Sequence, residues 1–124
     1  MLESADLVAF AATADLARAR AFYEGVLGLT VVDDTPIACV LDANGTTLRV
    51  TLVGDVVAVA PYTVLGWEVT DIEATIDDLV ARGVAFERFD GMAQRDSGVW
   101  EAPGGALVAW FKDPDGNVLS LTQL

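Results

Sequence analysis

Hydrophobic and polar positions follow the same order in both halves of this chain. In each half a short apolar stretch leads to an aspartate, Asp15 or Asp71, and then into a pattern with apolar residues three and four positions apart. That spacing predicts an amphipathic helix that covers one face of a sheet. Each aspartate stands where an N-cap belongs, and Gly28 and Gly83 stand where the helices should end.

The apolar stripes of the two helices are expected to consist of Leu16, Ala19, Phe22, Tyr23, Val26 and Leu27, and of Ile72, Thr75, Ile76, Leu79 and Val80. Strand-like stretches follow each helix, among them residues 84–90, with a tight turn predicted at Asn44-Gly45. Each half therefore reads as strand, helix and about three strands. We predict an α+β fold of two βαβββ modules, about 1–60 and 61–124, in one domain of residues 1–124.

The sequence Asp113-Pro114-Asp115-Gly116 joins the last two strand-like stretches, and it could serve either as a turn or as a pair of reactive carboxylates. Proline at the second position has its φ angle already set, Asp113 can accept from the amide two residues on, and Gly116 tolerates positive φ. Turn geometry accounts for every residue of the motif. We therefore expect no catalytic role for Asp113 or Asp115.

Composition and charge narrow the class of partner. The chain has 124 residues, 53% of them hydrophobic, so a sizeable core is expected. Its net charge of -12 repels nucleic-acid phosphates and anionic lipid, so we expect neither nucleic acid nor a membrane as partner. The start of the sequence lacks the pattern of a secretory signal, and Cys39 is the only cysteine, which excludes an intrachain disulfide. We expect a cytoplasmic protein.

Three features together carry a family resemblance: the paired βαβββ patterns, the helix ending RARAFYEGVLGL, and the closing AWFKDPDGNVLSL. The sequence resembles the vicinal oxygen chelate superfamily, which groups glyoxalase I, extradiol dioxygenases, fosfomycin-resistance enzymes and bleomycin-binding proteins. The resemblance covers essentially the whole chain. It implies a curved, cup-like mixed sheet with helices on its outer face, and a homodimer. In enzymes of the family, His and Glu side chains hold a divalent metal inside the cup.

The positions that hold this metal in the family carry other residues here. The resemblance places them at Val8, near Arg49, at Leu65 or, with a slip of one residue, Val64, and at Ser120. Catalytic metals need imidazole or carboxylate donors, and the chain contains no histidine. We expect no neighbouring strand position to turn a carboxylate the same way. We therefore predict no metal site, no cofactor and no catalytic residue of the family type.

Alternation of side chains along the strands assigns the lining of the cup. The lining is apolar and aromatic with one cation and a few hydroxyl groups, which is typical of a pocket for an organic ligand. The residues that we predict to contact the ligand are Phe10, Arg49, Trp67, Trp100 and Ser120. The pattern does not fix the parity of Trp100 and Trp110. A tryptophan on a curved sheet can equally belong to a core or a dimer interface, and that alternative stays open.

Arg49 allows two interpretations. An arginine within an otherwise apolar strand is costly unless it is paired. It can form an internal ion pair with Glu68 or Glu101, or it can take a carboxylate or phenolate of a ligand by a bidentate contact. Both interpretations stay open at this point.

Two function classes remain. The sequence favours a metal-free binding protein, similar to the bleomycin-resistance branch, that sequesters a small organic molecule such as an antibiotic without reaction. The alternative is a glyoxalase- or dioxygenase-like lyase or isomerase that acts without the usual metal and uses a carboxylate in the cup as its base. A Glu or Asp that faces the cup would favour this second class.

Overall fold

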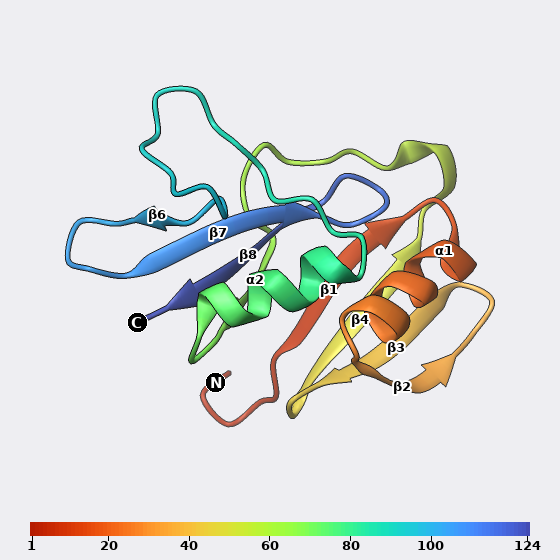
Figure 1. Cartoon of the computed structure of the whole chain (residues 1–124). Helices are drawn as coiled ribbons and strands as arrows, with labels where there is room; N and C mark the ends of the chain where they lie inside the picture. The colour runs from red at the N-terminus through yellow and green to blue at the C-terminus, as the bar shows by residue number, and fades with distance from the viewer. The chain divides into compact units, whose positions relative to one another are not determined.

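The computed structural model describes all 124 residues, which divide into two compact units, residues 1–58 and 59–124. Each unit contains one α-helix and one mixed sheet of four strands (Figure 1). The α+β class and the two βαβββ series that the sequence predicts are thereby confirmed. That the two units make one domain stays a prediction. No helix is long and apolar enough to cross a membrane.

The first unit consists of β1 (Val8–Thr13), α1 (Leu16–Arg20), η1 (Ala21–Val26), β2 (Thr30–Asp34), β3 (Ala38–Ala43), β4 (Thr46–Leu52) and a short 3-10 turn, η2 (Gly54–Val56). The strand order is β1-β4-β3-β2, with β1 parallel to β4 and the other pairs antiparallel. Asn44 and Gly45 both have positive φ angles, of 50° and 93°, as the predicted tight turn between β3 and β4 requires. Helix α1 contacts β3 and β4 and covers one face of this sheet.

The face of this sheet under α1 is apolar and buried. Leu41 and Leu48 are neighbours in register on β3 and β4, and at most 2% of either side chain is exposed. Phe22 and Tyr23 are also buried, and their rings meet edge to face with centroids 5.2 Å apart. Burial of these side chains is the main stabilising contribution to this unit, because it removes large apolar area from water.

The first helix differs from the sequence prediction in its second half. Asp15 caps it as expected, since its carboxylate accepts from the amide of Arg18 at 3.1 Å, and Gly28 follows it with a φ angle of 77°. Only Leu16–Arg20 is α-helical, however, and η1 has the wider turns of a π-helix. The amide of Leu27 donates to the carbonyl of Phe22, five residues back, at 2.9 Å. The extra residue in this turn gives no signal in a pattern of apolar spacing.

The second unit consists of β5 (Leu65–Glu68), α2 (Ile72–Ala81), β6 (Trp100–Glu101), β7 (Leu107–Lys112) and β8 (Val118–Gln123). The strand order is β5-β8-β7-β6, with β5 parallel to β8. Asp71 caps α2 by accepting from the amide of Ala74 at 3.1 Å, and the helix contacts β7 and β8.

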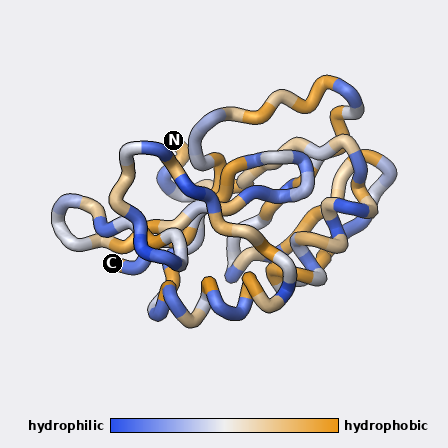
Figure 2. The backbone as a smooth tube through the Cα atoms, turned by 45° about the horizontal axis from the view of Figure 1, so that its top comes forward, coloured by the Kyte–Doolittle hydropathy of each residue, from blue (hydrophilic) through white to orange (hydrophobic).

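Hydrophobic and hydrophilic residues alternate along α2, as the colours of Figure 2 show. Ile72, Ile76 and Leu79 are buried against the sheet. The expectation that Val80 belongs to this stripe was wrong, because 53% of its side chain is exposed. Val80 lies at the edge of the apolar stripe, where the surface of the helix faces solvent and no longer faces the sheet.

The strand predicted at residues 84–90 does not form. This segment makes only an isolated bridge between Phe86 and Phe111, and the side chain of Gln94 takes the place of further strand pairing. Its amide nitrogen donates to the carbonyls of Glu87 and Gly98 at 3.1 and 2.8 Å, and its oxygen accepts from the amide of Phe89 at 2.8 Å. One side chain therefore satisfies three backbone groups that a strand would have paired.

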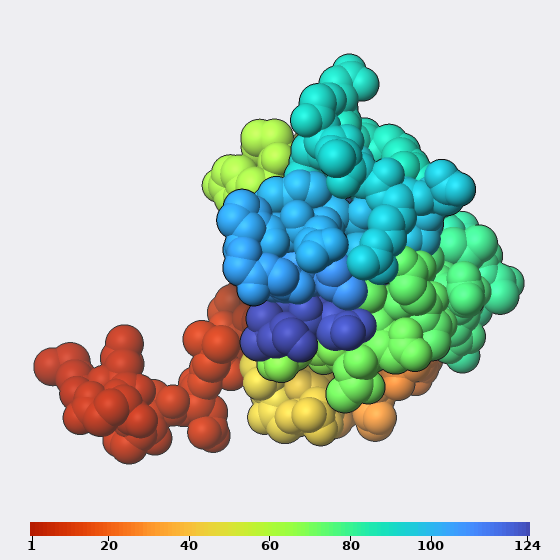
Figure 3. Space-filling view, turned by 60° about the vertical axis from the view of Figure 1, so that its left-hand side comes forward, coloured from red at the N-terminus to blue at the C-terminus, as the bar shows by residue number.

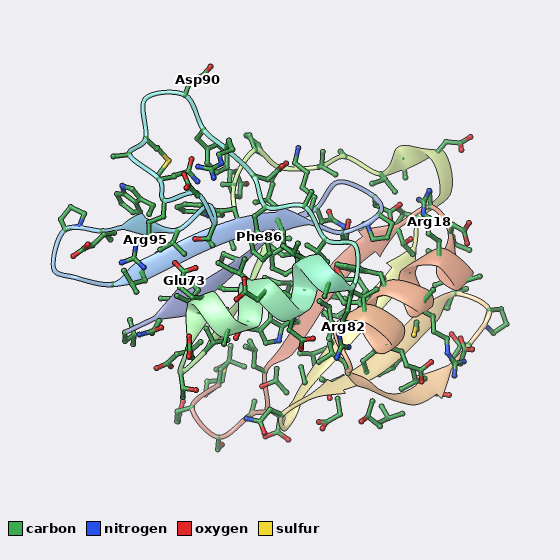
Figure 4. All side chains as sticks on the ribbon, viewed as in Figure 1. Arg18, Glu73, Arg82, Phe86, Asp90 and Arg95 are labelled. Atoms are coloured by element: carbon green, nitrogen blue, oxygen red, sulfur yellow. The ribbon has the colours of Figure 1, made fainter.

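The loop formed by residues 82–99 is also fastened to the start of α2. Glu73 Oε1 accepts from Arg95 Nη1 at 3.1 Å and from Ser97 Oγ at 3.0 Å, and Figure 4 shows the two charged side chains side by side. Because both charged groups are nearly half exposed, the ion pair itself contributes little to stability. Its effect is to fix where the loop lies on its own unit.

The turn between β7 and β8 has the geometry that its sequence predicts. Asp113 is 5% exposed, and its Oδ1 accepts from the amides of Asp115 and Asn117, both at 2.9 Å. Its Oδ2 accepts from Asn117 Nδ2 at 2.8 Å, and Gly116 has a φ angle of 91°. The Asp113 carboxylate is thus occupied by the turn, which confirms a structural role for it.

Candidate ligand-binding site

In each unit the helix covers one face of the sheet, and we call the opposite face the open face. The register of the first sheet assigns its members there: Val8, Phe10 and Ala12 on β1, Thr47, Arg49 and Thr51 on β4, and Ala38, Val40 and Asp42 on β3. Arg49 lies in the middle, with Phe10 on one side of it and Val40 on the other. The predicted parity of β1 and β4 is confirmed.

The open face of the second sheet follows from the register in the same way. Its members are Gly66 and Glu68 on β5, Val118, Ser120 and Thr122 on β8, Val108, Trp110 and Lys112 on β7, and Trp100 on β6. Gly66, Ser120 and Trp110 form one row across three strands. The row therefore runs from Gly66, which has no side chain, to the large flat side chain of Trp110.

Three aromatic rings gather at one side of this open face. The centroids of Trp100 and Trp110 lie 6.1 Å apart with their planes inclined by 37°. Phe89 meets Trp110 edge to face, with centroids 5.3 Å apart, and 40% of its side chain is exposed. Both tryptophans are half-buried. Rings held in this way offer a rigid apolar surface to a flat ligand.

Ser120 places a hydroxyl group next to these rings. It is directly opposite Trp110 in the ladder between β7 and β8, and its hydroxyl has no hydrogen-bond partner within the protein. A Cβ atom added to Gly66 would lie only 2.8 Å from Ser120 Oγ, so the missing side chain at residue 66 leaves the room that this hydroxyl occupies. The arrangement combines an aromatic surface with one free hydrogen-bonding group.

The face predicted for Trp67 was wrong by one residue. Leu65 and Trp67 are paired in register with Leu119 and Leu121, on the face of β8 that α2 covers. Gln123, on that same face, accepts from the amide of Ile72 at the start of α2 at 2.9 Å, which identifies the helix side. Ligand contact by Trp67 stays a prediction that this geometry disfavours.

The same register corrects two further expectations. Two positions were considered for the family's metal ligand on this strand, Val64 and Leu65. Val64 alternates with Gly66 and Glu68 and so belongs to the open face, whereas Leu65 belongs to the opposite face. Glu68 also lies on the open face, two residues beyond Gly66, although no carboxylate was expected to point this way. Glu68 is exposed to solvent.

The residues at the family's metal positions do not fit a metal ion. Val8 and Val64 are aliphatic, Arg49 is a cation, and only Ser120 has an oxygen to offer. No group of three or more Cys, Asp or Glu side chains lies close enough together to hold a metal ion. The enzymatic chemistry that depends on a metal in this family has no donor set here.

The structure thus brings the predicted site residues together in two pairs. Phe10 and Arg49 are neighbours on the open face of the first unit, and Trp100 and Ser120 share the open face of the second. Sequence reasoning left the face of Trp110 undecided and missed Phe89. The turn at residues 113–117 could have revealed Trp110, because a short turn fixes the register of its two strands and so sets Trp110 opposite Ser120.

Comparisons with known proteins agree with this fold. The sequence model of the glyoxalase/bleomycin resistance protein/dioxygenase superfamily matches residues 6–121. The chain therefore belongs to that superfamily, which confirms the resemblance seen in the sequence. No protein of curated function matches the chain.

Solved structures resemble the chain over nearly its whole length. A lactoylglutathione lyase from Agrobacterium tumefaciens is 19% identical with a TM-score of 0.74, over 97% of this chain and 93% of that one. A superfamily member from Sphaerobacter thermophilus is 21% identical with a TM-score of 0.75, over 100% of both chains. TnmS3, an antibiotic binding protein from Streptomyces sp. CB03234, is 26% identical with a TM-score of 0.72, over 99% and 98%. The first two likenesses concern the fold alone.

Proposed function

We propose that this protein binds a small, planar organic ligand without a metal and performs no reaction on it. The observation that carries the proposal is the half-buried pair Trp100 and Trp110, with Ser120 opposite Trp110 in register. Ser120 is 7% exposed, and its hydroxyl makes no hydrogen bond within the protein. Flat aromatic ligands gain free energy by stacking on such rings, and a single hydroxyl group gives the ligand an orientation. The likeness to TnmS3, which is named as an antibiotic binding protein, supports an antibiotic or similar aromatic compound as the ligand class.

The test is a screen of planar antibiotics and other aromatic compounds by quenching of tryptophan fluorescence and by thermal shift. A ligand that binds only the folded protein raises the melting temperature. For a compound found in this way, Trp110→Ala should weaken binding about tenfold to a hundredfold, as loss of a stacking contact does.

Trp67→Ala is the matched control, because Trp67 belongs to the same unit but faces α2. It should lower stability and leave affinity within about threefold, a difference that corresponds to well under the energy of one stacking contact. The opposite result, with binding lost in Trp67→Ala and kept in Trp110→Ala, would move the site to the other face. A screen in which no compound binds would remove the proposal.

Binding should not depend on a metal. Treatment with a chelator is expected to leave the affinity and the melting temperature unchanged, and added zinc, nickel, manganese or iron should not raise the melting temperature. The reason is the donor set, since Val8, Val64 and Arg49 offer no lone pair to a cation. One equivalent of tightly bound metal in the purified protein would contradict this.

A second candidate is the metal-free lyase or isomerase, and the observation that favours it is Glu68 on the open face with Ser120 and Thr122. Glu68 would then remove a proton from a carbon acid bound at this face. Proton exchange at a candidate substrate, lost in Glu68→Gln and kept in Glu101→Gln, would establish this function in place of simple binding.

We also propose that the protein is a cytoplasmic homodimer. Exposed apolar side chains support association of two copies: Leu2 and Leu7 near the N-terminus, red in Figure 3, are 78% and 75% exposed. Val56 and Tyr62 are 76% and 67% exposed. Apolar groups left in water favour a partner surface. Sedimentation that gives a monomer at micromolar concentration would contradict the dimer.

A further inference from the structure

The distribution of partners among the basic side chains singles out Arg49. The chain has 7 Lys and Arg residues and 19 Asp and Glu residues, so carboxylates outnumber the basic side chains with which they could form ion pairs. The basic residues that form ion pairs with carboxylates are Arg20, Arg82, Arg95 and Lys112. Arg88 donates to the carbonyl of Asp96, and Arg18 is also engaged. Arg49 alone has no hydrogen-bond or ion-pair partner.

The surroundings of Arg49 make the missing partner costly. Arg49 is half-buried in the central part of β4, and its neighbours in register are the ring of Phe10 and the side chain of Val40. A guanidinium group in such a place loses part of its hydration, and neither neighbour can return a hydrogen bond. A bound anion would give the guanidinium group the hydrogen bonds that it no longer makes with water.

A second polar group near Arg49 also lacks a partner. Thr51 is two residues further along β4 and therefore on the same open face. Its Oγ1 atom is buried and makes no hydrogen bond. The neighbours of Thr51 in register are Ala12 and Ala38, so the space beside it is bordered by the smallest side chains that carry a Cβ atom. The open face of β4 thus carries, two residues apart, a guanidinium group and a hydroxyl group that both lack partners. A buried hydroxyl group without a hydrogen bond is rare.

The aromatic ring next to Arg49 indicates what the rest of the ligand is. Phe10 is 60% exposed although it lies in the middle of β1, where it is the neighbour of Arg49 in register. An exposed ring next to an unpaired guanidinium group suits a ligand that has an aromatic body and an anionic oxygen group. The planar fork of arginine matches the two oxygens of a carboxylate better than any other side chain does.

We propose that the open face of the first unit is a subsite for an aromatic carboxylate. Arg49 donates to both carboxylate oxygens, the Thr51 hydroxyl donates to one of them after rotation about its side-chain bond, and Phe10 packs against the ring. The subsite rests on residues of the first unit only. It extends the proposed ligand-binding function by a second ligand class, a negatively charged aromatic acid, and does not depend on the rings of the second unit. The strongly acidic chain would repel such a ligand elsewhere on its surface, so the one unpaired cation also makes the subsite selective.

The experiment compares two probes of the same shape, naphthalene-2-carboxylate and the neutral naphthalene-2-carboxamide, by calorimetric titration at one fixed salt concentration. The intact protein should bind the carboxylate about tenfold to a hundredfold more tightly, which is the range expected for hydrogen bonds to a charged group. Arg49→Gln should abolish this preference, and Arg49→Lys should keep part of it. Phe10→Ala should weaken both probes to a similar extent.

Arg82→Gln is the control. It also removes one positive charge, but Arg82 lies at the end of α2, in the second unit, where it forms an exposed ion pair with Asp78. It should leave the preference for the carboxylate unchanged. The melting temperature gives a second readout: Arg49→Gln should not lower it, since no ion pair is lost, whereas an internal ion pair of Arg49 would lower it markedly.

Equal affinity of the two probes for the intact protein overturns the subsite and leaves the proposed binding of neutral planar ligands standing. A preference that survives Arg49→Gln, or the failure of the carboxylate to bind at millimolar concentration, overturns it as well. If the carboxamide binds to the intact protein and to Arg49→Gln but not to Trp110→Ala, the proposed binding at Trp100 and Trp110 is supported independently of the subsite.

Discussion

Ser120 Oγ lies 2.8 Å from the point where a Cβ atom of residue 66 would stand, so the hydroxyl and a side chain at Gly66 exclude each other. Gly66 is not among the glycines with a positive φ angle, so its backbone conformation does not itself require glycine. The close contact with Ser120 is therefore the main obstacle to substitution.

Gly66→Ala should be neutral or destabilising by itself and stabilising in the presence of Ser120→Ala. Alanine lowers the entropy of the unfolded chain, which alone contributes about 0.4 to 1 kcal/mol, and the contact with Ser120 Oγ offsets this gain. Urea unfolding of both single variants and the double variant measures the coupling, expected at about 0.5 to 3 kcal/mol. Simple additivity of the two substitutions would show that the contact relaxes without cost.

Thr51→Val should raise the free energy of unfolding by about 1 kcal/mol, because it removes a buried oxygen that makes no hydrogen bond. Thr13→Val is the matched control, and it should lower the free energy of unfolding. Thr13 is fully buried, its hydroxyl donates to the carbonyl of Asp15 at 3.0 Å, and it accepts from the amide of the same residue at 3.1 Å. A Thr51→Val variant less stable than the parent would mean that the hydroxyl has a partner in solution.

Asp113→Ala should destabilise the protein by about 2 to 4 kcal/mol, because it leaves two buried amides and the Asn117 side chain without their acceptor. Asp90→Ala, in an exposed loop position labelled in Figure 4, should stay within about 0.5 kcal/mol of the parent. Chemical denaturation of both variants tests the comparison. Equal effects would show that the turn does not depend on the Asp113 carboxylate.

Stability should fall as the pH rises above about 8.5, the usual value for a cysteine thiol. Burial raises the pKa of Cys39, and the nearby Asp34 carboxylate raises it further. With the folded-state pKa above the unfolded one, the unfolded chain loses its proton first, so the thiol's contribution is fully present below the unfolded pKa and is lost as the pH rises through the folded pKa.

Denaturation at a series of pH values from 7 to 10 tests this expectation, with Cys39→Ala as the control. The variant should lose the part of the slope that belongs to the thiol. The same fall in both proteins would assign the slope to other groups.

The sequence predicts most of the fold because its signals are local and agree with one another. Asp15 and Asp71 cap their helices, and the turns at Asn44-Gly45 and at residues 113–116 form as expected. The prediction fails where the decision is not local. β5 has only four residues, too few to show its alternation, and it pairs with β8, which is distant in sequence, so the face of Trp67 was wrong by one residue.

The candidate site is predicted less well than the fold for the same reason. Phe10, Arg49 and Ser120 lie on the expected faces, since each is in a strand whose phase is set by clear alternation. Phe89 could not be found, because its position depends on the loop that Gln94 organises, and a polar residue in an irregular segment gives no periodic signal.

The three hydrogen bonds of Gln94 make this loop sensitive to chemical ageing. The side chain must donate twice and accept once, and only an amide of this length does both. Hydrolysis of that amide would turn Gln94 into a glutamate, whose oxygens would face the carbonyls of Glu87 and Gly98 with no proton between them. Deamidation at this one residue would thus release the segment that contains Phe89 from its place against Trp110, and ligand affinity would fall.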